Sequence, residues 1–196
     1  LRDQEANLPE RAVRAEYAQE IVADYPFHPE LLTTLNRKTS TIPSFQKTRG
    51  ALRLLARTVR ELWAKRPPDA TLIHTHHLDL SVDDIVNDLT SRLDRPAFRH
   101  VVEADIVSPR AGTRAHAQEL DAHRVTEGKP AYATRAATAI FLHSLTQGVA
   151  SGVDPADLTV AALQPGGEPA LLNKSLQDLE AEAWSLDMDG HRYRFK

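Results

Sequence analysis

The sequence predicts a mainly α-helical protein that ends in a small α+β module with the element order of a winged-helix domain. Apolar residues recur at helical spacing over most of the 196 residues. Prolines and glycines lie where helices are expected to begin or end. The last third of the chain contains three helical segments followed by an alternating segment that is typical of a β-hairpin.

The N-terminal part is predicted to begin with two helices. Pro9 is placed to open the first, because proline is tolerated in the first turn of a helix. Val13, Tyr17 and Ile21 follow at a spacing of four, so they are expected to form one apolar stripe. Residues 29–32 are expected to start a short second helix after a break at two prolines.

A long basic helix is predicted over residues 44–64, after a polar loop over residues 39–44. The residues expected to face inward are Leu52, Leu55, Val59 and Leu62. The arginines expected on the outward face, spaced four, four and three apart, are Arg49, Arg53, Arg57 and Arg60.

The middle of the chain carries weaker signals. Ser81, with Asp84 three residues later, predicts a capping box that opens another helix. The inward residues of that helix are Ile85, Leu89 and Leu93. Residues 98–106 fit either a helix or a strand, and a polar helix is expected over residues 114–124.

The last third predicts three helices and a hairpin. An alanine-rich helix begins at Pro130, and its apolar residues are Ala133, Ala137, Ile140, Phe141 and Leu145. Asp154 is an N-cap ahead of a proline that starts the second helix. The third covers about residues 169–183, with Leu172, Leu176 and Leu179 inward. Residues 184–195 then form a hairpin that turns at Asp189-Gly190.

These elements suggest two domains. We predict a helical domain over residues 1–108, a connecting segment over 109–128 and a winged-helix-like domain over 129–196. The third helix of the second domain would be the recognition helix, but it is acidic. Its one basic residue is Lys174, and its acidic residues are Asp178, Glu180 and Glu182. Because phosphate neutralisation supplies most DNA affinity, this helix is better suited to packing on protein than to reading bases.

The charge distribution is uneven. The chain sums to −3, yet residues 37–66 hold nine basic side chains against one acid, Glu61. There is no cysteine, so disulfides and thiolate chemistry are excluded, and no apolar run approaches the length of a membrane helix. We therefore expect a cytoplasmic protein without membrane partners. Because the chain begins at leucine, we also expect it to be an excerpt of a longer protein.

Two enzyme chemistries receive little support. Residues 74–79 resemble a metal-hydrolase motif, and zinc held by His74 and His76 is one hypothesis; a polar loop ahead of a helix is the favoured alternative. No G-x-x-x-x-G-K-[ST] segment occurs, so this chain alone is expected to be inactive towards nucleoside triphosphates. We assign no metal site.

The arginine stripe is the main candidate site. Guanidinium groups match phosphate oxygens, so the stripe could contact nucleotide or nucleic acid. A solvated helix face is the alternative, although such faces usually mix both signs of charge.

Three further segments indicate a family. Residues 25–32 (YPFHPELL), 45–56 (FQKTRGALRLLA) and 61–63 (ELW) resemble the region just past the nucleotide-binding core in large, predicted bacterial AAA+-type ATPases. Some members of that family are encoded beside DNA methylases in gene clusters linked to phage defence. Shorter matches at residues 142–145, 163–166 and 193–195 extend the resemblance over most of the chain.

The resemblance implies a helical AAA+ lid followed by the winged-helix-like module, in a parent protein that binds ATP and magnesium. It implies that Arg49 is a phosphate sensor that acts catalytically only beside the missing upstream core. Lys47, Arg53, Arg57 and Arg60 are weaker candidates for phosphate contacts. The expected partners are that ATPase core, with DNA or protein as further candidates, and an oligomer is compatible with the full-length protein. The alternative function is a nucleic-acid-binding module that uses the basic face of residues 47–66.

Overall fold

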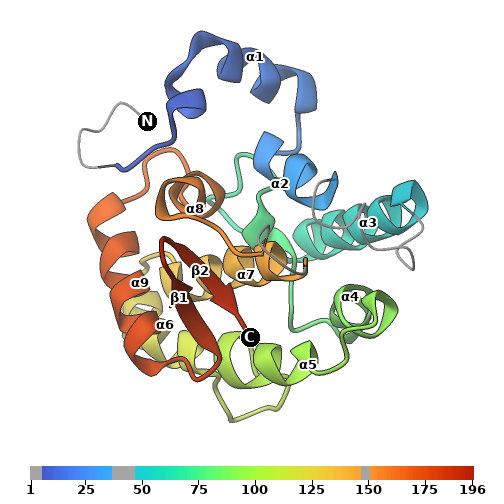
Figure 1. Cartoon of the computed structure of the whole chain (residues 1–196), viewed down its shortest axis with the longest axis vertical. Coiled ribbons are helices and arrows are strands. Elements are labelled where there is room, and N and C mark those ends of the chain that lie inside the picture. Colours follow the sequence, from blue (N-terminus) through green and yellow to red (C-terminus); the bar gives the residue numbers. More distant parts are fainter. Residues whose placement is uncertain (1–5, 37–46, 147–150) are drawn as a thin grey trace.

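The computed structural model describes residues 6–36, 47–146 and 151–196, except for the side chains of residues 47 and 48. Within these residues the protein is mainly helical and ends in a two-stranded antiparallel hairpin (Figure 1). The predicted class, mainly α with a C-terminal hairpin, is confirmed at this level. In the same residues, no helix combines the length and the apolar character needed to cross a membrane.

The N-terminal elements are η1 (Glu10–Val13), α1 (Ala15–Asp24) and α2 (Pro29–Thr34). The predicted first helix is broken at Arg14, whose backbone is extended. This break changes the face that Val13 presents, and its side chain is 66% exposed, so the predicted apolar stripe is wrong at that position. Tyr17 is buried and donates a hydrogen bond to Glu30 at 3.2 Å, which ties α1 to α2.

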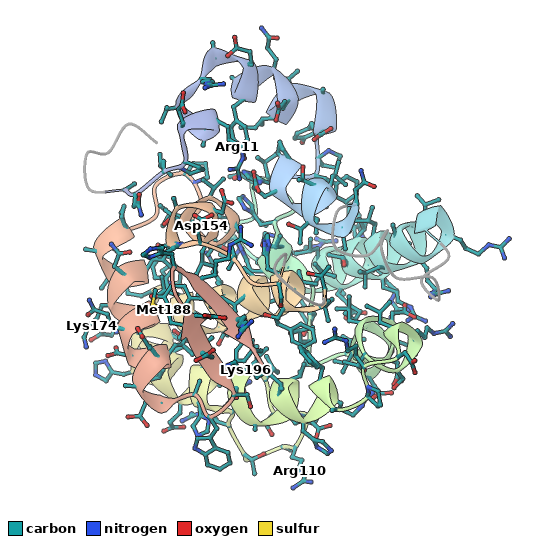
Figure 2. All side chains as sticks on the ribbon, viewed as in Figure 1. Arg11, Arg110, Asp154, Lys174, Met188 and Lys196 are labelled. Carbon is teal, nitrogen blue, oxygen red and sulfur yellow. The ribbon has the colours of Figure 1, made fainter. Side chains whose placement is uncertain are left out.

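A second contact holds this N-terminal segment to the body of the molecule. The guanidinium group of Arg11 lies 2.9 Å from the Glu30 carboxylate and also contacts Asp157 in the first turn of the later helix α8 (Pro155–Ala162). Figure 2 shows Arg11 between the N-terminal helices and that helix. Otherwise α1 stands apart at one end of the molecule (Figure 1).

The middle elements are α3 (Lys47–Lys65), η4 (Thr75–His77), α4 (Asp83–Leu89), η5 (Ser91–Leu93), α5 (Phe98–Val101), the π-helix η6 (Val102–Ile106) and α6 (His116–Thr126). The segment that fitted helix or strand is therefore helical. The predicted loop over residues 39–44 lies outside the described residues.

The capping box predicted at Ser81 is wrong. Helix α4 has Val82 as its N-cap residue, without a side-chain cap. The backbone N–H and the hydroxyl of Ser81 both donate to the Asp79 carboxylate, at 3.0 and 2.6 Å. This aspartate turn engages the serine before the helix begins, so its hydroxyl is not used as a cap.

The C-terminal elements are α7 (Tyr132–Ser144), α8 (Pro155–Ala162), α9 (Pro169–Glu182), β1 (Leu186–Asp189) and β2 (Arg192–Phe195). The predicted cap is confirmed, since Asp154 accepts a hydrogen bond from the Asp157 N–H at 3.0 Å. The three leucines predicted to face inward from α9 are buried. The strands pair with Leu186 opposite Phe195, so the two-residue loop is Gly190-His191, one position later than predicted.

Helix α7 lies at the centre of the core. It packs against α6, α8, α9, β2 and η4, and its buried residues include Ile140 and Phe141. Its N-terminus is capped from another helix, because the Asp121 carboxylate accepts from the backbone N–H groups of Ala133 and Thr134 at 3.0 and 2.7 Å. One cluster of buried residues extends from α2 to β2 and so includes parts of both predicted domains.

A buried carboxylate also holds the hairpin in place. Asp105, in η6, accepts from the backbone N–H groups of Trp184 and Ser185 at 3.0 and 2.8 Å. His116 Nδ1 lies 2.8 Å from the same carboxylate. The segment that leads into β1 is therefore attached to the middle of the chain by a fully buried polar group.

Gly152 is required where the chain passes under the hairpin. Its φ is +87°, and a Cβ atom there would lie 2.7 Å from the carbonyl oxygen of Tyr193. The next residue, Val153, exchanges two backbone hydrogen bonds with Tyr193, so this carbonyl is held in place. We expect Gly152→Ala to lower the free energy of unfolding by at least about 2 kcal/mol, measured by urea denaturation.

Gly166→Ala is the matched control for this prediction. Gly166 also has a positive φ, +80°, but nothing lies within 4 Å of a Cβ atom built there. Gly166→Ala should therefore lower the free energy of unfolding only by the backbone strain, about 1 kcal/mol. Equal losses in the two variants would show that the contact with Tyr193 has no effect.

Candidate phosphate-contacting face of helix α3

Helix α3 is rotated relative to the prediction. Its most deeply buried residues are Leu54 and Thr58, both fully buried, and the Thr58 hydroxyl donates to the Leu54 carbonyl oxygen at 3.0 Å. Leu52 and Val59, predicted to face inward, are 61% and 39% exposed. The prediction was wrong for these two residues because Arg53 and Arg57 also turn towards the inner side of the helix, where they bind a buried carboxylate.

Two arginines of the stripe are bound to a buried carboxylate. Asp88 of α4 is fully buried, and both of its oxygens lie within 3.2 Å of Arg53 Nε. Arg57 Nη1 donates to the same carboxylate at 2.6 Å and to the Asp84 carbonyl oxygen at the same distance. Arg92 Nε lies 3.0 Å from the other oxygen of Asp88. The predicted outward position of Arg53 and Arg57 is thus corrected: their guanidinium groups turn towards α4.

Other cations of the helix have nearby partners. Arg60 contacts Glu61 through Nε and Nη2 at 3.1 and 3.0 Å. Lys65 forms an ion pair with Asp79. The Arg66 guanidinium lies over the Trp63 ring, 5.5 Å from its centroid. Much of the basic excess seen in the sequence is therefore neutralised locally.

Arg49 differs from the other three arginines of the stripe. It is exposed in the first turn of α3, where there is no acidic residue, and no ion pair joins it to another described residue. Lys47 precedes it, but the side chain of Lys47 lies outside the described part of the chain. A guanidinium group beside the N–H groups of a helix N-terminus is suited to binding an anion.

The exposed side of α3 is also apolar in part. Leu52 and Trp63 are 61% and 75% exposed, and they lie on the same side of the helix as Arg49 and Arg60 by helical spacing. The exposed cations of this face suit a ligand or partner that carries phosphate or acidic groups.

A cluster of four histidines lies in the interior. Residues 26–28 pair with Ile73 through two backbone hydrogen bonds, which places the His28 ring 4.1 Å from the His74 ring in a stacked arrangement. The His76 ring is also stacked on that of His74, at 5.2 Å, and the ring of His77 lies 4.3 Å from that of His76. Stacked rings present faces rather than lone pairs to one another. Within the described residues, no three histidine, aspartate or glutamate side chains are arranged to hold a metal ion.

The histidine rings of the cluster are neutral at pH 7. Burial lowers the pKa of His28 and of His77 to about 4. Burial, together with charge on its histidine neighbours, lowers the pKa of His74 to about 2 and that of His76 well below its usual value. Both ring nitrogens of His74 are buried without a hydrogen-bond partner. Because buried polar atoms without partners are unfavourable, this cluster is a place where the core is easily destabilised.

Two important residues were missed in the sequence. Asp88 lies between Ile85 and Leu89, on the side of α4 predicted to be buried, and a charged residue there indicates a buried ionic partner. His28 gives no such signal, because only the pairing of residues 26–28 with Ile73 brings it to the other histidines.

The sequence of the chain matches one known family. A family model described as the DUF499 second domain matches residues 10–157, about three quarters of the chain. The chain belongs to this family. No curated protein and no solved structure matches it.

Proposed function

We propose that this chain is the lid and docking part of a bacterial AAA+-type ATPase, and that Arg49 senses the phosphate of a nucleotide held by another domain. The observation that carries the proposal is the difference between the arginines of α3. Arg53 and Arg57 are held by Asp88 and Arg60 contacts Glu61, whereas Arg49 is exposed without an ion pair to any described residue.

The chemistry of the site fits this role. A guanidinium group that reaches the γ-phosphate stabilises charge on the transferring phosphoryl group and couples its loss to movement of the lid. ATP and magnesium would then be bound mainly by the parent's core, since this sequence contains no P-loop. The family description, a second domain, is compatible with a parent that has at least one other domain.

The C-terminal elements support a docking role. Helices α7, α8 and α9 with the β1–β2 hairpin follow the order of a winged-helix domain. Lys174 of α9 is engaged by Asp178 at 2.5 Å, and Glu180 and Glu182 are exposed beside it. This acidic helix favours contact with protein over insertion into a DNA groove.

The test measures ATP turnover by the full-length parent. We expect Arg49→Ala to reduce turnover about 10²–10³-fold, as loss of one donor to a developing charge does. Arg110→Ala, which removes an exposed arginine from the loop after η6, should leave turnover unchanged. Unchanged turnover in the Arg49 variant, with an intact fold, would contradict the proposal.

The alternative is nucleic-acid binding by the basic face of residues 47–66. Arg49 and Arg60 favour it, because residues eleven apart lie on the same side of a helix and both are exposed. Asp88 weakens it, because it neutralises Arg53 and Arg57. Binding by this face should fall steeply with salt and be lost when Arg49 and Arg60 are both replaced by alanine.

A further inference from the structure

Helix α1 presents an apolar stripe to solvent. Tyr17 is its only buried residue. Ala15, Ala18 and Val22 are exposed at spacings of three and four, which place them on one side of the helix, and Val22 is 78% exposed. Tyr25, directly after the helix, is also exposed and extends the row. We call these four exposed residues the α1 stripe; the described part of the chain leaves it open to solvent.

Helix α3 presents a second exposed row, on the side away from the core. Its residues, all exposed, are Leu52, Ala56, Val59 and Trp63. Their spacings of four, three and four are those of the apolar seam between two packed helices. The buried Leu54 and Thr58 lie on the opposite side of the helix. We call the exposed row the α3 stripe, and its spacing suits contact with a second helix.

The two stripes match in length and in side-chain size. At 1.5 Å per residue, the ten residues of α1 extend over about 15 Å and residues 52–63 extend over about 17 Å. The α1 stripe contains two alanines, whereas the α3 stripe carries the larger Leu52 and Trp63. Large side chains of one helix can therefore pack against small side chains of the other.

The two helices also carry opposite charge. The charged residues of α1 are Glu16, Glu20 and Asp24, all of them acidic. No ion pair joins Glu16 or Glu20 to another described residue. At the two ends of the α3 stripe, Arg49 and Arg66 are exposed and likewise form no ion pair with a described residue. The charges of α1 and α3 are thus complementary.

This complementarity determines which stripes can pair. Two α1 stripes in contact would bring acids together, and two α3 stripes would bring arginines together. An α1 stripe on an α3 stripe brings opposite charges together instead. Within one chain, α1 lies at one end of the molecule and α3 at its side, well apart from each other (Figure 1). The favourable pairing therefore needs two molecules.

We propose that α1 of one copy of this chain packs along the α3 stripe of a second copy. The contact joins two different surfaces, so it is heterologous and runs head to tail. Trp63 is the main anchor, because a tryptophan that becomes buried in an interface contributes strongly to binding. A contact between one helix of each molecule is small, so the association is weak and depends on concentration. This proposal goes beyond nucleotide sensing, and its test leaves Arg49 unchanged.

The test is sedimentation velocity of the full 196-residue chain over about 10 to 500 µM protein. The weight-average sedimentation coefficient should rise with concentration. Val22→Lys places a cation against the arginines of α3, and Trp63→Ala removes the anchor. Each substitution should weaken self-association at least about tenfold. Both side chains are exposed, so the fold of the monomer should be unaffected.

A mixture of the two variants distinguishes a head-to-tail contact from a symmetric one. An equimolar mixture should form dimers, because the α1 stripe of the Trp63→Ala variant and the α3 stripe of the Val22→Lys variant are both unaltered. Association should stop at the dimer, since the two remaining stripes each carry a substitution. A symmetric contact would be lost in only one of the two variants.

Val125→Lys and Trp184→Ala are the matched controls. Val125 lies in α6 and Trp184 just before β1, and their side chains are 53% and 82% exposed. Both elements lie away from α1 and α3 (Figure 1). The controls should retain wild-type association. A chain that stays monomeric at every concentration, a mixture that stays monomeric, a loss in only one of the two stripe variants, or equal weakening in the controls would each overturn the proposal.

Discussion

Replacing Asp88 with asparagine is expected to lower the free energy of unfolding by about 3 kcal/mol, the lower end of the range for breaking a buried ion pair. The carboxylate is fully buried and contacts Arg53, Arg57 and Arg92 within 3.2 Å. Asparagine keeps the shape but removes the charge, so the arginines lose their counter-ion. The side chains of Arg53 and Arg57 are 32% and 20% exposed, and this residual hydration keeps the loss near the lower limit.

The control for this prediction lies on the same helix. Asp83→Asn removes a carboxylate that is 74% exposed and contacts Arg99 at 2.7 Å. Exposed pairs contribute little, so this variant should lose less than about 1 kcal/mol. Urea denaturation at pH 7 measures both variants. Similar losses in the two would mean that burial of Asp88 is not what gives its ion pairs their strength.

Acidification is expected to destabilise the protein steeply below about pH 6.5, where unfolded histidines begin to bind protons. Burial lowers the folded-state pKa of His28 and His77 to about 4 and that of His74 to about 2. Between pH 6.5 and these lowered pKa values, the unfolded chain binds more protons than the folded chain. The stability that the neutral histidines contribute is therefore fully present above pH 6.5 and is lost as the pH falls. Each such histidine contributes about 1.4 kcal/mol per pH unit within the window.

This dependence can be measured by urea denaturation between pH 7.5 and pH 5, a range about one unit or more above the ordinary carboxylate pKa values. His74→Phe should make the slope shallower by about one proton, because one group that binds protons only when unfolded is removed. His123→Phe is the control, since its side chain is 84% exposed. Parallel slopes for wild type and His74→Phe would contradict the role assigned to the cluster.

Several elements could be predicted from the sequence because their causes are local. Asp154 caps α8 by accepting a hydrogen bond from the backbone N–H of Asp157, only three residues later. Leu172, Leu176 and Leu179 define the buried face of α9, and the alternation of Tyr193 and Phe195 with arginines defines the inner face of β2. In each case residues within one or two turns determine the result.

The candidate site was predictable only in part. The sequence indicates an arginine-rich helix, and the helix forms over Lys47–Lys65. It does not show which arginines are free to meet a ligand, because that depends on Asp88, more than thirty residues away. Leu52 and Val59 were assigned to the wrong face for a related reason. The spacing of the apolar residues is compatible with two similar rotations of the helix about its axis, and the buried ion pair selects one of them.

The helical class, the terminal hairpin and the concentration of basic charge in residues 37–66 could all be predicted from the sequence, since each follows from neighbouring residues. The distribution of that charge between exposed and buried positions depends on the tertiary fold. Asp88 binds Arg53 and Arg57 and so makes them unavailable to a ligand, and the pairing of residues 26–28 with Ile73 brings His28 to His74. These outcomes depend on contacts between distant segments, because burial and long-range pairing set the partner of each charged group.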